Sequence, residues 1–136
     1  MIYEGTISYV KIDTNGNDKA IKEQFIVENA DLFTEVKMRL HEVFGTLPDY
    51  DATAIKRSRI REICNERDND EDKIYIAALV DTFTNDDGVE KETKYQVAFF
   101  AKDIANAHSY IEKYASQGYN MRISGIKETK FIDVLK

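Results

Sequence analysis

The sequence is poor in the residues that build cross-links and cofactor sites. Its 136 residues include one cysteine, one proline, two histidines and no tryptophan. A single cysteine excludes an intramolecular disulfide and agrees with a reducing compartment. Because Cys64 ends a strand-like run with no histidine nearby in the sequence, we interpret it as a core residue and not as a catalytic thiol.

Long apolar runs are also missing. No stretch approaches the roughly 18 apolar residues that a membrane-spanning helix needs. The first residues, MIYEGTISYV, show neither the basic nor the apolar region of a signal peptide. We therefore expect a cytoplasmic protein with no membrane partner.

Motifs for catalysis or metal binding are absent. The sequence has no Gly-rich phosphate loop, no G-x-S-x-G and no H-E-x-x-H. His41 and His108 have no histidine or cysteine at metal-ligand spacing. Asp68, Asp70 and Asp72 resemble the opening of a calcium loop, but lysine and leucine stand where its glycine and its bidentate glutamate belong. We predict a non-enzymatic protein without a metal or cofactor.

The net charge of −6 is concentrated in one segment. Residues 65–72, NERDNDED, carry one basic and five acidic groups, which is four of the six net negative charges. Residues 1–64 carry 9 basic and 11 acidic groups, and residues 73–136 carry 9 of each. We expect residues 65–72 to form a solvated linker, and the rest of the surface to be nearly neutral.

The two flanks of this linker are related to each other. Aligning Gly16 with Gly88 gives an offset of 72 and a set of identities: Ile2/Ile74, Tyr3/Tyr75, Gly16/Gly88, Lys19/Lys91, Lys22/Lys94, Gln24/Gln96 and Asp31/Asp103. After a slip of one residue, IKRSRIREI at 55–63 aligns with IKETKFIDV at 126–134. The sequence therefore predicts one domain, 1–136, made of repeat one (1–64), the linker and repeat two (73–136).

Each repeat shows the same order of structural signals. Two alternating apolar runs, 3–12 with 22–28 and 74–83 with 93–101, flank turns rich in Asn, Asp and Gly, which predicts a hairpin. A helical pattern follows, capped by Asp31 or Asp103 and stopped by Gly45 or Gly118. The segments 55–63 and 126–134 then form a third strand.

We therefore predict an α+β fold of two tandem β-β-α-β repeats. Two helices should pack on antiparallel sheet, related by a pseudo-twofold axis, because one small repeat buries too little apolar surface alone. Whether the strands form one sheet or two is left open by the sequence.

The two third strands differ in charge, and this difference indicates a candidate site. In an extended segment Arg57, Arg59 and Arg61 point to one side, where the second copy has Glu128, Lys130 and Ile132. With Lys56 and Arg39 nearby, three guanidinium groups would suit a phosphate or carboxylate. The alternative is a solvent-facing strand that pairs with the acidic linker and resists aggregation.

The sequences of these segments resemble those of a known family. The N-terminal strand pair, VENADLFTEVKMRLHEVF, IKRSRIREI and the closing FIDVL resemble a family of small domains of unknown function from gut bacteria, their mobile elements and their phages. The resemblance implies no catalytic residues. It implies the setting of a phage or mobile-element gene, whose small accessory proteins often act on host machinery or host defence.

Three classes of function are consistent with these observations. We favour a ligand-binding protein that sequesters an anionic, nucleotide-type host immune signal through the arginines. A protein-interaction module acting on a host or phage protein is the alternative. Nucleic-acid binding comes third, because the basic segment is short and the linker acids would repel a long polyanion. We also expect a homo-oligomer, since a duplicated domain offers repeated edges.

Overall fold

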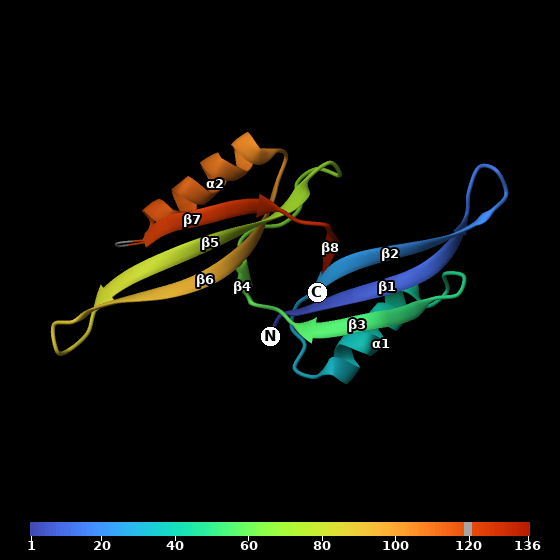
Figure 1. The fold of residues 1–136 in the computed structure, drawn as a ribbon, viewed down its shortest axis with the longest axis horizontal. Coiled ribbons are helices and arrows are strands. Elements are labelled where there is room, and N and C mark those ends of the chain that lie inside the picture. The colour runs from blue at the N-terminus through green and yellow to red at the C-terminus, as the bar shows by residue number, and fades with distance from the viewer. Residues whose placement is uncertain (119–120) are drawn as a thin grey trace. The chain divides into compact units, whose positions relative to one another are not determined.

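The computed structural model describes residues 1–118 and 121–136 (Figure 1). These residues form two compact units, of which the first contains residues 1–58 and 130–136 and the second contains residues 59–129. Each unit has one four-stranded sheet and one helix. The predicted α+β class with two similar units is confirmed, and the question of one sheet or two is answered in favour of two.

The first sheet has the strand order β3-β1-β2-β8. Its strands are β1 (Tyr3–Ile12), β2 (Asp18–Val27), β3 (Asp51–Arg57) and β8 (Phe131–Leu135). Helix α1 (Phe33–Phe44) packs on one face, where Val36 and Leu40 lie fully buried against Ile7 and Phe25. Gly5 is needed there, because a Cβ at that position would lie 2.8 Å from a methyl carbon of Leu40.

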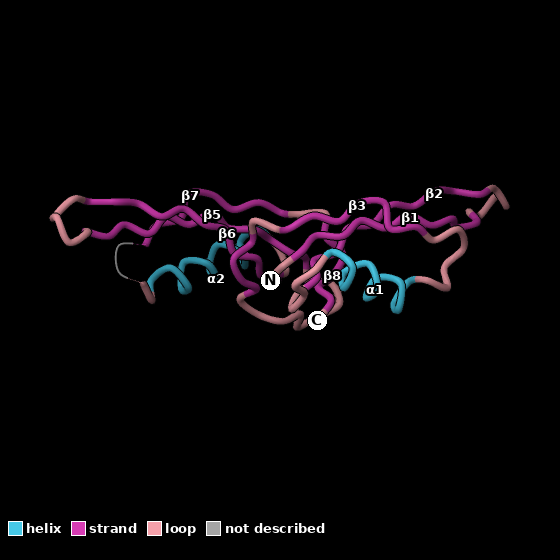
Figure 2. Tube along the Cα trace, turned by 90° about the horizontal axis from the view of Figure 1, so that it is seen from below, coloured by secondary structure: helices cyan, strands magenta, loops and turns pink. Residues whose placement is uncertain are grey.

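The second sheet repeats this plan with the order β4-β6-β5-β7. Its strands are β4 (Ile60–Ile63), β5 (Lys73–Thr84), β6 (Glu90–Ala101) and β7 (Met121–Glu128). Helix α2 (Ile104–Ser116) packs on one face through Ala107 and Ile111, which contact a core containing Leu79 and Phe99. Figure 2 shows each helix lying along one face of its own sheet. The opposite face, called the open face below, carries no helix of the described part of the chain.

The helix N-caps agree with the sequence prediction in one repeat only. The Asp103 carboxylate accepts a hydrogen bond from the Asn106 amide at 2.8 Å, as a capping aspartate should. In the first repeat Leu32 is the cap residue and has no side-chain cap, so the prediction of Asp31 was wrong. Asp31 precedes the cap residue by one position. Its backbone amide donates a hydrogen bond to the Glu35 carboxylate at 3.4 Å.

The segments expected to be single third strands are each divided between the two sheets. Residues 51–57 pair with β1 in the first sheet, whereas residues 60–63 pair in parallel with β6 in the second. Correspondingly, β7 pairs with β5, while β8 pairs in parallel with β2. Each repeat thus gives its last strand to the other unit, and the sheets are mixed instead of purely antiparallel.

Residue spacing explains where the strand breaks. Ile55 faces the core of the first unit, so in a continuous strand the buried position would next fall on residue 57, which is arginine. The next buried residue is Ile60, which is out of phase with Ile55 by one residue. The four residues between them are all polar, so none of them can fill a buried position. The strand ends where the amide of Ser58 donates a hydrogen bond to the Ile2 carbonyl at 2.9 Å.

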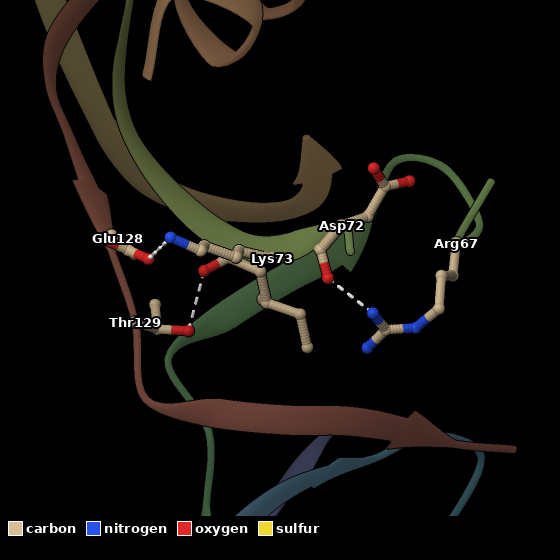
Figure 3. Close-up of polar contacts among 6 residues, drawn as sticks. Arg67, Asp72, Lys73, Glu128 and Thr129 are labelled. Atoms are coloured by element: carbon tan, nitrogen blue, oxygen red, sulfur yellow. Dashed lines mark hydrogen bonds and ion pairs between the residues drawn. The ribbon is translucent and has the colours of Figure 1, made fainter. Parts of the chain in front are cut away.

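The acidic segment 65–72 lies within the second unit and is held by several hydrogen bonds. The side-chain amide of Asn65 bonds the backbone of Phe100 in both directions, at 3.0 and 2.7 Å. The Asp72 carboxylate accepts the amides of Asp68 and Asn69, each at 3.0 Å, and Arg67 donates to the Asp72 carbonyl (Figure 3). The segment is therefore a structured connection into β5.

Candidate functional site

The five predicted site residues do not form a single cluster on one strand. Arg57 lies in the first unit, where its guanidinium donates to the Met1 sulfur at 2.6 Å. Arg59 and Arg61 belong to the second unit, because the break after β3 separates them from Arg57. The expectation of three arginines on one side of one strand was therefore wrong, for the reason of spacing given above.

Two of the other cations have structural roles. Arg39, on α1, donates to the carbonyls of Glu28 and Asn29, the latter at 2.9 Å, and Asn29 has a positive φ of 56°. This guanidinium therefore stabilises the turn that leads into α1. Lys56 lies 3.8 Å from Glu4 across the first sheet and is strongly exposed, so this ion pair contributes little stability.

Arg61 is occupied by an aromatic contact on the helix side of the second sheet. Its guanidinium carbon lies 4.6 Å from the centre of the Tyr95 ring, and Tyr95 packs against the α2 core. The pKa of Tyr95 is raised, chiefly because burial disfavours the phenolate, while the positive charge of Arg61 acts in the opposite direction.

Beside this contact lies Cys64, which we interpreted from the sequence as a core residue and not as a catalytic thiol. Burial, with a smaller contribution from the neighbouring Glu62 carboxylate, raises the pKa of Cys64 to about 12. Tyr114 donates its hydroxyl to Glu62, and burial together with this hydrogen bond raises the pKa of Tyr114. A thiol with such a pKa stays protonated at neutral pH and is a poor nucleophile. This group of residues has the character of core packing.

Arg59 has a different environment, on the open face of the second sheet. It lines a hollow of about 460 Å³. The other lining residues come from the three longest strands of this sheet: Ala78, Leu79, Val80, Lys94, Tyr95, Gln96 and Ser124. We call this feature the basic hollow. Its volume lies within the range of ordinary small-molecule pockets.

Strand alternation explains why these side chains share a face. Leu79 and Tyr95 pack toward α2, so their neighbours Ala78, Val80, Lys94 and Gln96 point to the open face. Ser124 is the extra residue of a bulge in β7, between Ile123 opposite Leu79 and Gly125 opposite Ala78. Such bulges commonly redirect a side chain next to a binding site.

The charge at the basic hollow is positive and largely uncompensated. Among the residues that the structure describes, no hydrogen bond or ion pair engages the Arg59 guanidinium or the Lys94 ammonium group. Arg122 adds a third cation, since Lys94 and Arg122 flank Val80 on either side in the sheet. Arg122 is held by Glu92 at 3.1 Å. The floor, by contrast, is made by Ala78 and Val80.

This arrangement can bind an anion but offers little for catalysis. Gln96 and Ser124 supply neutral hydrogen-bonding groups beside the two cations. None of the described lining residues is an aspartate, glutamate, histidine or cysteine. In residues 1–118 and 121–136, no three such side chains lie close enough together to hold a metal ion.

Sequence reasoning identified Arg59 but missed Lys94, Gln96, Ser124 and Arg122. A signal for two of them was present, because Lys22/Lys94 and Gln24/Gln96 are among the few identities between the repeats. Apolar identities follow from the shared core, whereas a lysine and a glutamine on an open face have no packing reason to match. Ser124 depends on the bulge, which the sequence pattern does not reveal.

Comparison with known proteins adds family membership. Neither described helix is long and apolar enough to cross a membrane. No curated protein and no solved structure matches the chain. The family model described as "Domain of unknown function (DUF4494)" matches residues 1–136. The chain therefore belongs to this family of domains of unknown function.

Proposed function

We propose that the protein is a non-enzymatic binder that sequesters a small phosphate-bearing ligand of the nucleotide type. The observation that carries this proposal is the basic hollow, which has an apolar floor and in which neither Arg59 nor Lys94 pairs with an acidic group of residues 1–118 or 121–136. A phosphate group would accept charge-assisted hydrogen bonds from the two cations. The flat part of the ligand would lie on Ala78 and Val80.

The biological setting of this proposal comes from the resemblance and not from the site. A phage or mobile-element accessory protein gains from removing a host signal by stoichiometric binding. We therefore propose nucleotide-type immune signals as the first ligands to test, including cyclic dinucleotides and ADP-ribose derivatives.

A thermal-shift panel of such compounds tests the proposal directly. A ligand present at 100 times its dissociation constant stabilises the folded state by about 2.7 kcal/mol, which raises the midpoint of a small domain by several degrees. Nucleotides, cyclic dinucleotides and ADP-ribose derivatives should be screened with inorganic phosphate alongside. A shift for one compound class identifies the ligand, whereas a flat panel would contradict the proposal.

Two matched substitutions then locate the binding site. The double variant Arg59→Ala/Lys94→Ala should weaken binding by about 100-fold or more, since each charge-assisted hydrogen bond contributes about 1.5–3 kcal/mol. Lys91→Ala is the control, because Lys91 lies on the same strand but, by alternation, on the opposite face from Lys94. Equal affinity of the double variant and Lys91→Ala in calorimetric titration would place the ligand elsewhere.

One observation favours a protein partner as the second candidate function. Four apolar side chains on α1 and its cap are more than half exposed: Leu32, Phe33, Met38 and Val43. The core of the first unit takes Val36 and Leu40 from this helix and leaves these four side chains outside it. A flat ligand panel would make this helix the next surface to examine, with Val43→Asp as the variant that should lose the partner.

A further inference from the structure

The open face of the first sheet repeats the binding groups of the basic hollow. Lys22 pairs with Ser8 as Lys94 pairs with Val80, and Gln24 pairs with Thr6 as Gln96 pairs with Ala78. Because Tyr3, Ile7 and Phe25 face α1, these residues face the other way. The lysine and the glutamine therefore occupy equivalent positions on both open faces.

The hydroxyl group of the site is also repeated. The bulge in β3 occurs between Thr6 and Ile7, which are equivalent to Ala78 and Leu79. Its extra residue is Thr53, whose hydroxyl lies 3.4 Å from the Thr6 carbonyl. Thr53 thus stands in the first sheet where Ser124 stands in the second.

The fourth group arrives through the exchanged strand. In the second unit, Arg59 directly precedes Ile60, which pairs with Gln96. In the first unit, Lys130 directly precedes Phe131, which pairs with Gln24. Lys130 is exposed, and neither it nor Lys22 forms an ion pair within the described residues.

The two faces differ in their charge and in their floor. Asp51 pairs with Ser8 where Arg122 pairs with Val80, so a negative charge replaces a positive one. Thr6 and Ser8 replace the apolar floor of Ala78 and Val80. Glu4 also points to this face, where it accepts a hydrogen bond from Ser58 and lies 3.8 Å from Lys56.

We propose that the open face of the first sheet is a second binding site for the same class of phosphate-bearing ligand, weaker than the basic hollow. The inference rests on the proposed function and adds a stoichiometry of two per chain. The lysine, glutamine, hydroxyl and exchanged-strand cation bind the phosphate at both sites. Asp51 lowers the affinity of the first by roughly tenfold or more, since a charge-assisted contact is lost and a repulsive one is gained.

An NMR titration with ADP distinguishes the two sites. The amide signals of Gln96 and Ser124 report on the basic hollow, and those of Gln24 and Thr53 report on the first open face. Both sets should shift, with the second-unit set saturating at an ADP concentration lower by roughly tenfold or more. Asp51→Arg should then bring the two saturation curves together, by tightening only the first-unit set.

Substitutions provide the matched controls. Lys22→Ala/Lys130→Ala should abolish the shifts at Gln24 and Thr53 and leave those at Gln96 and Ser124 unchanged. Lys19→Ala, which removes the same charge from the other face of β2, should change neither set.

The possible outcomes separate this inference from the proposed function. Shifts confined to Gln96 and Ser124 would overturn the second site while supporting the proposed function. The second site would also be overturned if Asp51→Arg did not raise the ADP affinity reported by Gln24 and Thr53. The same holds if the signals of Gln24 and Thr53 saturated at a lower ADP concentration than those of Gln96 and Ser124. No shift in either set up to millimolar ADP would contradict both proposals for this ligand class.

Discussion

Arg59 and Arg61 show how two side chains of one type, two residues apart, acquire different roles. Arg61 falls in the bulge of β4 and covers the Tyr95 ring on the helix side of the sheet. Arg59 precedes the strand and lines the basic hollow on the open face. A guanidinium stacked on a partly buried ring contributes to stability, whereas one without a partner beside an apolar floor is available to a ligand.

Asp72 is the acidic residue whose environment is most clearly built by the fold. Its carboxylate accepts the amides of Asn69 and Asp68, and these two hydrogen bonds lower its pKa below the ordinary value of 3.8. A carboxyl group with a lowered folded-state pKa stabilises the protein fully above its ordinary pKa. That stabilisation is lost as the pH falls through the folded-state value.

Asp72→Asn should therefore flatten the acid limb of the stability curve. The free energy of unfolding of the wild type should fall more steeply than that of the variant as the pH falls below about 4. Urea unfolding at a series of pH values measures the difference. Asp70→Asn is the control, because the Asp70 side chain accepts no hydrogen bond among the described residues, and identical curves for both variants would refute this role of Asp72.

At the scale of the element, the hairpin turns are the best-predicted feature. Asp13 and Asn85 are equivalent, and each side chain accepts two amides from its own turn. Each turn then reaches a glycine with positive φ, +80° at Gly16 and +77° at Gly88. The sequence predicts such turns because the information is local, carried by a few residues with unusual backbone preferences.

Gly88→Ala should destabilise the protein by about 1 kcal/mol. A Cβ at this position meets no neighbouring atom within 4 Å, so the cost comes from the left-handed backbone alone. Gly125→Ala provides the comparison, since that site is equally open and its backbone has no positive φ. Chemical denaturation of both variants measures the difference, and equal stabilities would show that the turn relaxes to another conformation.

The third strands show where local information ends. The segment IKRSRIREI has strand propensity along most of its length. Its nine residues contain no local signal that it is divided between two sheets. The division depends on the pairing of Ile60 with Gln96 of β6, which is a property of a distant strand. For the same reason the sequence placed three arginines together and missed the lysine and glutamine that the sheet brings to Arg59.

At the scale of the whole molecule, the exchange of last strands makes each unit depend on a distant part of the chain. Leu135 closes the second repeat in sequence but packs against the core of the first unit. Cys64 is its equivalent in the first repeat, and it packs against the core of the second unit. Backbone hydrogen bonds hold both exchanged strands in place. The Glu28 amide donates to the Leu135 carbonyl, and the Cys64 amide donates to the Ala98 carbonyl, each at 2.8 Å.

Substitution of these two equivalent residues should therefore act across the repeats. Leu135→Ala should destabilise the first unit by about 2 kcal/mol, because it removes a partly buried aliphatic side chain from that core. In hydrogen exchange, protection should fall in β1, β2 and α1, and remain unchanged in β5, β6 and α2. Cys64→Ala should give the reverse pattern with a smaller effect, since a smaller side chain is removed.

The two variants serve as controls for each other. If each repeat completed its own sheet, Leu135→Ala would lower hydrogen-exchange protection in the second unit and Cys64→Ala would lower it in the first. The unit that loses protection therefore decides between the two topologies. Because Lys130 directly precedes β8, the strand that contains Leu135, loss of that strand should also remove the proposed weaker ligand site. The exchanged strands thus link the stability of each unit to the completeness of its binding face.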